Sequence, residues 1–241
     1  MTTDLLELHA ATGCVYSPEG RMIRVNSPDA VPPPRMHLAG CESGWIVRFR
    51  DDVDDRAARA IEELVRREPP LRRPGTTPRF AEDYRALLGV AEPLSARNYG
   101  PVHLLPHGTR ASSRIAIVRH NTPDGDALWT ELAAGMPPGL AEAGFTSVDD
   151  FWAPWCAALV EGEIAAIAFA ARLGGHGADI GVYTLAPYRG RGLAAAVTAA
   201  WSALPELRER TLFYSTHRDN LSSQRVIARL GLPYLGESMR L

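Results

Sequence analysis

The sequence contains no lysine, so all 26 of its basic residues are arginine. They are balanced by 28 acidic residues, and the formal net charge is −2. A chain this close to neutral has no long-range field that would attract a polyanion, so we expect no nucleic-acid partner. The missing lysine, beside abundant alanine, glycine and proline, is typical of a compositionally biased genome and indicates no function.

Long apolar runs are also missing. No stretch approaches the roughly 20 apolar residues that a membrane-spanning helix needs. The first residues, MTTDLLELHAATG, lack the basic segment followed by an apolar run that marks a secretory signal. We therefore expect a cytoplasmic protein with no membrane association.

Cysteine is scarce. Cys14, Cys41 and Cys156 are odd in number and far apart, and none belongs to a CxxC pair or has a histidine at metal-ligand spacing. We expect free thiols and no structural metal.

The chain of 241 residues is long enough for a main domain with a smaller lobe. Residues 1–111 are predicted to form a small α/β lobe, with a strand at 45–50 and a helix at 52–67 that carries apolar residues along one face. The first forty residues include three consecutive prolines and show little periodicity, so we expect an irregular arm there.

Residues 112–241 are predicted to form the main domain. Turn residues separate three strand-like runs at 156–160, 164–172 and 179–184, which is typical of an antiparallel meander. Further strands at 114–119, 211–216 and 234–241 mix with helices that begin near residues 122, 193 and 221. The sequence therefore predicts an α/β (α+β) fold with a mixed, mostly antiparallel central sheet flanked by helices.

A glycine-rich turn, Arg189-Gly190-Arg191-Gly192-Leu193-Ala194, lies between a predicted strand and a predicted helix. Glycine lets the backbone approach a phosphate closely and adopt positive φ. The free amides and the dipole at the start of a helix add positive potential. Such a turn fits a pyrophosphate, although tight packing alone also produces turns of this kind.

A second motif, one strand later, makes the turn more specific. It begins at Asn220, continues through Ser223 and ends at Leu230-Gly231-Leu232. Together the two motifs resemble the GNAT superfamily of N-acetyltransferases, whose phosphate loop reads Arg/Gln-x-x-Gly-x-Gly/Ala and whose later helix begins Asn-x-x-Ser/Ala and ends Leu-Gly-Phe. The resemblance covers roughly residues 114–241, with Leu232 replacing the usual aromatic residue. It implies the GNAT acyl-CoA N-acyltransferase fold, with acetyl-CoA as co-substrate.

The resemblance also implies a coenzyme site. The backbone of the strand before the loop would pair with the pantetheine arm, and the loop amides would hold the pyrophosphate, with arginine charges nearby. Asn220 would contact the pantetheine arm, although asparagine is also a strong helix cap and both roles can coexist. The implied cofactor-binding residues, with no metal ligand among them, are Val182, Tyr183, Thr184, Arg189, Gly190, Arg191, Gly192, Leu193, Ala194, Asn220 and Ser223.

The proton chemistry is less defined. In many superfamily members a tyrosine seven residues after the asparagine acts as the general acid, and this chain has Ile227 at that position. Tyr183, Tyr214, Ser215 and His217 are the nearest groups able to donate or relay a proton. For the base, the resemblance favours Asp179, with a solvated residue at a turn edge as the alternative. The candidate catalytic residues are Asp179, Tyr183, Tyr214 and His217.

Three functions follow as expectations. The first is transfer of an acetyl group from acetyl-CoA to a primary amine, of a small molecule because no extended charged groove is evident. The second is an acyl-CoA-binding or sensing module without transfer activity, because Ile227 stands where the acid is expected. The third is an acyltransferase with another acyl donor. The N-terminal lobe would narrow the acceptor pocket or form a degenerate acetyltransferase-like copy, and both a monomer and a homodimer remain open.

Overall fold

The computed structural model describes residues 2–28, 31–111 and 115–241. The predicted boundary between residues 111 and 112 borders the segment 112–114, which lies outside the described residues, as does the predicted strand's first residue, Arg114. The division into two regions therefore stays a prediction.

A nine-stranded sheet forms the centre of the described chain, in the order β4-β3-β11-β5-β10-β9-β8-β7-β6. The only parallel pair in this order is β9 with β10, and every other neighbouring pair is antiparallel. This arrangement confirms the mixed, mostly antiparallel sheet. The strands are β3 (Met36–Cys41), β4 (Gly44–Phe49), β5 (Tyr99–Leu104), β6 (Ala116–Arg119), β7 (Cys156–Val160), β8 (Glu163–Leu173), β9 (Gly177–Thr184), β10 (Thr211–Ser215) and β11 (Tyr234–Arg240).

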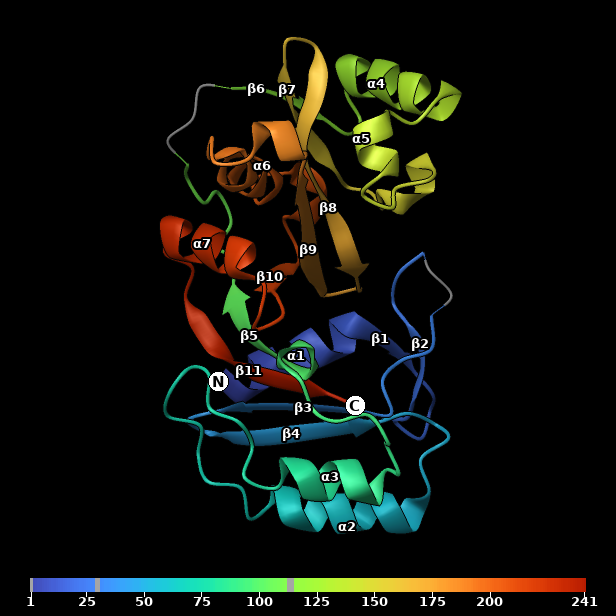
Figure 1. Cartoon of the computed structure of the whole chain (residues 1–241), viewed down its shortest axis with the longest axis vertical. Coiled ribbons are helices and arrows are strands. Elements are labelled where there is room, and N and C mark those ends of the chain that lie inside the picture. Colours follow the sequence, from blue (N-terminus) through green and yellow to red (C-terminus); the bar gives the residue numbers. More distant parts are fainter. Residues whose placement is uncertain (1, 29–30, 112–114) are drawn as a thin grey trace.

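Helices cover both faces of the sheet (Figure 1). On one face, α6 and α7 enclose an apolar core with the alanine-rich strands β7 and β8. On the other face, α4 and α5 enclose an aromatic cluster that includes Phe151 and Trp155, while α1 packs on the middle strands. The helices are α1 (Thr2–Gly13), α2 (Asp55–Val65), α3 (Ala81–Leu87), α4 (Pro123–Ala134), α5 (Pro138–Ala141), α6 (Leu193–Trp201) and α7 (Leu221–Leu230).

The described part of the first forty residues, 2–28 and 31–40, consists largely of regular elements, so the predicted irregular arm is wrong. These elements are α1, the short antiparallel pair β1 (Cys14–Tyr16) and β2 (Met22–Val25), and β3. Leu6, His9, Ala10 and Thr12 are buried on α1. Because polar and apolar residues are both buried there, α1 has no clear apolar stripe, and periodicity could not reveal it.

The final strand, β11, does not pair with β10, the strand before it in the sequence. It lies between β3 and β5, both of which belong to the predicted N-terminal lobe. Elements from the two ends of the chain therefore meet in the middle of the sheet, next to β10 (Figure 1). This topology brings N-terminal residues to the edge of the site described below.

Candidate functional site

The parallel strands β9 and β10 separate soon after they meet. They are paired at Thr211 with Gly177, Leu212 with Ala178 and Phe213 with Asp179, and at no later position. Strand β9 continues to pair with β8 as far as Thr184, and β10 continues along β5. The strands therefore diverge, and the β10-facing edge of residues 180–184 keeps backbone groups that an extended ligand can pair with.

A cavity of about 590 Å³ lies at the wide end of this divergence. Its walls come from the end of β9, the glycine-rich loop, the start of α6, β10 and one face of α7. Most of the predicted coenzyme residues meet here. The cavity is lined by Val182, Tyr183, Thr184, Tyr188, Arg189, Gly190, Gly192, Leu193, Ala194, Ala195, Tyr214, Asn220, Ser222, Ser223, Arg225, Val226 and Arg229.

The loop leaves the first amides of α6 without a side-chain cap. Gly192 is the N-cap of α6 at φ 79°, and glycine is needed because this left-handed conformation strains other residues. Helix α7 differs, because Oδ1 of Asn220 accepts a hydrogen bond of 3.1 Å from the amide of Ser223. The helix-cap role of Asn220 is therefore present, whereas the start of α6 keeps donors and a positive dipole end for an anion.

Three arginines line this cavity: Arg189, Arg225 and Arg229. Nε of Arg189 donates to the carbonyl of Thr184 at 3.2 Å, and within the described chain Arg225 and Arg229 form no ion pair. The predicted Arg191 is not among the residues that line the cavity, and its guanidinium stands 5.4 Å from the ring centre of Tyr188. Arg225 and Arg229 were not predicted as site residues. They lie four residues apart in the helix that follows Asn220, and this spacing places both on one helix face, which the sequence could have indicated.

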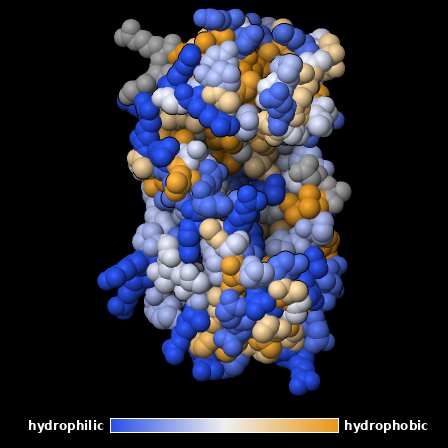
Figure 2. Space-filling model, viewed as in Figure 1, coloured by the Kyte–Doolittle hydropathy of each residue, from blue (hydrophilic) through white to orange (hydrophobic). Residues whose placement is uncertain are grey.

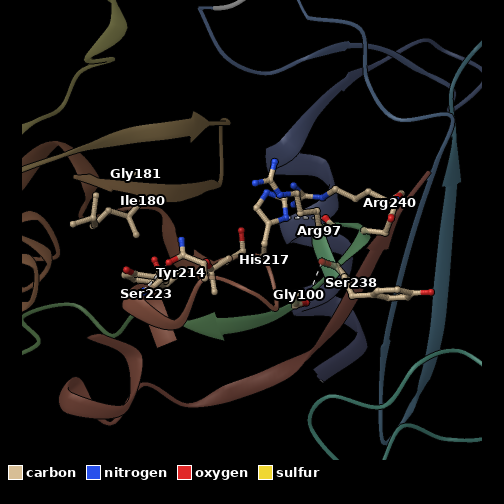
Figure 3. Close-up of a pocket in the computed structure, with 15 residues that line it drawn as sticks. Arg97, Gly100, Ile180, Gly181, Tyr214, His217, Ser223, Ser238 and Arg240 are labelled. Atoms are coloured by element: carbon tan, nitrogen blue, oxygen red, sulfur yellow. Dashed lines mark hydrogen bonds between the residues drawn. The ribbon is translucent and has the colours of Figure 1, made fainter. Parts of the chain in front are cut away.

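A second cavity, of about 230 Å³, adjoins the first and opens between the diverging strands. The two cavities share Val182, Tyr214, Asn220 and Ser223. The remaining lining of the second cavity comes largely from Arg97–Gly100, the end of β10 and the end of β11. Figure 3 shows Ile180, Gly181, Tyr214 and Ser223 at one end of it and Arg97 and Arg240 at the other.

The two candidate tyrosines have different surroundings. Tyr214 is buried and lines both cavities. Burial raises the pKa of its phenol, against a smaller opposing effect of a hydrogen bond with Ser223. Tyr183 lines only the larger cavity, and its ring packs edge-on against Phe145 at 5.4 Å between centroids. Tyr214 is therefore the tyrosine at the junction, and its high pKa keeps it protonated near neutral pH.

Asp179 is buried beneath the second cavity and is only 6% exposed. Its Oδ2 accepts hydrogen bonds from Oγ of Ser215 at 2.5 Å and from Nε2 of His9 at 3.2 Å. Its Oδ1 accepts from the amide of Ser215 at 3.1 Å. Burial acts to raise the pKa of Asp179, but the contacts with His9 and Ser215 and the charge of Arg240 hold that pKa below its ordinary value.

This geometry excludes the alternative of a solvated turn-edge aspartate. Asp179 does not line the cavity itself, whereas Ser215 does, so the carboxylate reaches the cavity through that hydroxyl. His9 was missed because it lies in α1, which was predicted to be irregular. The sequence carries no local signal for its contact with Asp179.

His217 and Ile227 complete the set of predicted positions. His217 is exposed in the second cavity, and its Nδ1 donates to the carbonyl of Arg97 at 2.8 Å. Ile227 is buried in the core shared by β10, α6 and α7, among aliphatic side chains. The structure therefore gives this position a packing role in α7.

The described residues show neither a candidate metal site nor a membrane-spanning helix. No group of three or more His, Cys, Asp or Glu side chains among them could hold a metal ion. No helix in the described ranges is long and apolar enough to span a membrane.

Within the described residues, the site combines a strand edge without a partner strand, a helix start without a side-chain cap and three arginines. Residues 126–232 match the acetyltransferase (GNAT) family. The matched segment contains β9, the glycine-rich loop, β10 and α7, so this part of the chain is similar to the acetyltransferase (GNAT) family. No curated protein matches the chain.

The comparison with solved structures found similarity at low identity and with TM-scores below 0.5. A protein described as a GNAT-family acetyltransferase from Novosphingobium aromaticivorans is 21% identical, with a TM-score of 0.40, over 60% of this chain and 65% of that one. The chain thus spans less than two thirds of that protein. A GCN5-related N-acetyltransferase-like protein from Streptococcus suis is 14% identical over 100% of this chain and 98% of that one, at a TM-score of 0.42. A tandem GNAT protein from the clavulanic acid biosynthesis pathway is 17% identical over 98% and 91%, at a TM-score of 0.46.

Proposed function

We propose that this protein is an N-acetyltransferase that transfers the acetyl group of acetyl-CoA to a primary amine of a small molecule. The observation that carries the proposal is the junction of the two cavities between β9 and β10. One cavity offers helix-start amides and three arginines to a pyrophosphate. The other is small and meets the first at Tyr214, where a thioester and an amine would come together.

The residues present fit coenzyme A. A side chain at Gly192 would place its Cβ 3.0 Å from Nη1 of Arg229, so the absence of a side chain keeps this gap open for a phosphate. The backbone edge of residues 180–184 is free of β10 and supports pairing with a pantetheine arm. Oγ1 of Thr184 is buried without a hydrogen-bond partner in the described structure, which supports a polar ligand atom beside it.

In this proposal acetyl-CoA supplies a thioester whose carbonyl carbon the amine nitrogen attacks. The C–N bond forms, the C–S bond breaks, the amine loses one proton and the departing thiolate gains one. Ser215 and Asp179 are suited to take the amine proton, because the serine hydroxyl faces the cavity and bonds to a carboxylate that stays ionised. Tyr214 is suited to protonate the thiolate, because it lies where the two cavities meet and its phenol is in the acid form near neutral pH.

A thiol-release assay with acetyl-CoA and a panel of small amines tests the proposal. Release of coenzyme A that depends on amine, with the acetylated amine identified by mass spectrometry, is the expected result. Binding of acetyl-CoA without turnover of any amine would favour a sensing module. Faster release of coenzyme A from a longer acyl thioester than from acetyl-CoA would indicate an acyltransferase with another acyl donor.

A further inference from the structure

The second cavity carries positive charge at the end that lies away from the coenzyme cavity. Its lining includes Arg97, His217 and Arg240 and contains no aspartate or glutamate. Figure 3 shows Arg97 and Arg240 together at this end, with His217 beside them. The space-filling view also shows hydrophilic residues around a hollow at the middle of the molecule (Figure 2). The charged side chains that line this end of the cavity are therefore all basic.

Arg240 is free to bind a ligand. It is exposed at the end of β11, where its carbonyl accepts a hydrogen bond of 2.9 Å from Nδ2 of Asn98, which fixes the backbone. Its guanidinium has no ion pair or hydrogen bond within the described residues. The neighbouring carboxylate of Asp179 already accepts three hydrogen bonds and lies beneath Ser215.

Arg97 is also available. Its Nε lies 3.5 Å from Oδ2 of Asp219, and its side chain is 83% exposed. An ion pair this loose and solvated holds the guanidinium weakly, because exposed pairs contribute about 0–1 kcal/mol. A ligand anion can therefore take donors from Arg97 at little cost.

The two ends of the cavity set what the acceptor must look like. Its amine has to reach the junction at Tyr214 and Ser215, where the proposed function places the thioester. Its other end then lies against Arg97 and Arg240. A second ammonium group there would be repelled, whereas a carboxylate or phosphate would gain charge-assisted, bidentate hydrogen bonds.

We propose that the acceptor is a small amine that also carries an anionic group, a carboxylate or a phosphate, which Arg97 and Arg240 bind. This proposal rests on the proposed function and adds the substrate class. The acetyl transfer itself is unchanged: the amine nitrogen takes the acetyl carbon, coenzyme A leaves as the thiol, and the anionic group takes no part in bond making.

The test compares matched acceptors with the purified full chain and acetyl-CoA. The acceptors are γ-aminobutyrate, its methyl ester, β-alanine, aminoethyl phosphate, ethanolamine and putrescine. The pairs compared are γ-aminobutyrate with its methyl ester and aminoethyl phosphate with ethanolamine. In each pair the kcat/KM for the anionic amine is expected to be at least about tenfold higher, with the difference mainly in KM. Comparison of kcat/KM between the carboxylate acceptors and aminoethyl phosphate decides which anion the site prefers.

Variants then assign the preference to residues. Arg240→Gln and Arg97→Gln are each expected to bring the ratio of anionic to uncharged acceptor toward one, and Arg240→Lys to restore part of it. Arg72→Gln, an exposed arginine outside both cavities, is the control and should leave the ratio unchanged.

The result against this inference differs from the result against the proposed function. If Arg240→Gln leaves the ratio intact, the binding of the anionic group by Arg240 is wrong. If no anionic amine is a better acceptor than its uncharged partner, the substrate class is wrong. In that case, acetylation of the ester or of the diamine would still support the proposed acetyltransferase activity. Failure to bind acetyl-CoA at all would instead overturn the proposed function.

Discussion

Oγ of Ser215 donates a hydrogen bond of 2.5 Å to Oδ2 of Asp179. The serine lines the second cavity, while the aspartate is buried beneath it. The pair therefore connects the cavity with an ionised carboxylate that no acceptor touches directly. This link is the basis of the first two predictions.

Replacement of the hydroxyl should slow the reaction without affecting the coenzyme. Ser215→Ala is expected to lower kcat/KM for the amine by about tenfold to a hundredfold, because the amine then loses its proton only to water. The rate of the variant should keep rising to higher pH as more free amine forms, and its affinity for acetyl-CoA should stay the same. Ser238→Ala is the matched control, because that hydroxyl lines the same cavity but donates to the carbonyl of Gly100. A wild-type pH profile in Ser215→Ala would exclude the relay.

The ionised Asp179 should also contribute to stability in a pH-dependent way. Asp179→Asn is expected to lower the free energy of unfolding by about 1–3 kcal/mol at neutral pH, because a buried acceptor with three donors is altered. The folded-state pKa of Asp179 is below its ordinary value of 3.8. Its contribution is therefore complete above that value and lost as the pH falls through the lower folded pKa.

Urea unfolding of wild type and variant between pH 7 and 3 measures this effect. The difference between the two proteins should shrink on the acid side. Asp124→Asn, at an exposed helix start, provides the comparison for general charge effects. A difference that stays constant down to the lowest pH would mean that folding does not lower the pKa of Asp179.

The proposed mechanism gives the acid role to Tyr214 and not to Tyr183, because Tyr214 lines both cavities and Tyr183 lines only the larger one. Tyr214→Phe is expected to lower kcat by about tenfold to a hundredfold with little change in the KM for acetyl-CoA, because only the proton donor is removed. Tyr183→Phe should lose less, because that ring packs against Phe145 and lines only the coenzyme cavity. Steady-state kinetics of both variants decide the assignment. A larger loss in Tyr183→Phe would reverse it.

The coenzyme motifs could be predicted from the sequence because they are local. Arg189, Gly192, Asn220 and Ser223 follow each other across one helix and one strand, and the structure brings them to the wall of one cavity. The strands on either side were also predicted closely, at 179–184 and 211–216 against the observed Gly177–Thr184 and Thr211–Ser215. Alternating burial and turn residues carry this information along the chain.

The acceptor side could not be predicted in the same way. Arg97, Arg240 and His9 come from η1 (Ala96–Asn98), β11 and α1. Each reaches the site by a separate long-range contact, because η1 leads into β5, which pairs with β10, β11 pairs with β5, and α1 packs on β9. No pattern within any of the three segments reports these contacts. The lining of the second cavity therefore depends on long-range topology, whereas most of the lining of the larger cavity lies within two local motifs.

The buried cysteines should be unreactive in the native protein. Cys14, Cys41 and Cys156 are all buried and free. Burial raises the pKa of Cys156 to about 12 and also raises that of Cys14, so little thiolate exists at pH 8. A thiol reagent is expected to react slowly with the folded chain and fully after unfolding in guanidinium chloride. Fast labelling of the folded chain would contradict the described burial.

The central claim is that acetyl-CoA binds beside Gly192, and titration calorimetry of two matched variants tests it most directly. Gly192→Ala and Gly89→Ala both place a side chain at positive φ, 79° and 65°, so each should cost about 1–2 kcal/mol of backbone strain. Only the methyl group at Gly192 enters the gap beside Arg229, since nothing lies within 4 Å of one at Gly89. The account predicts saturable binding of acetyl-CoA to wild type and to Gly89→Ala, and affinity lower by at least about tenfold in Gly192→Ala. No binding to wild type, or equal affinity in both variants, would contradict it.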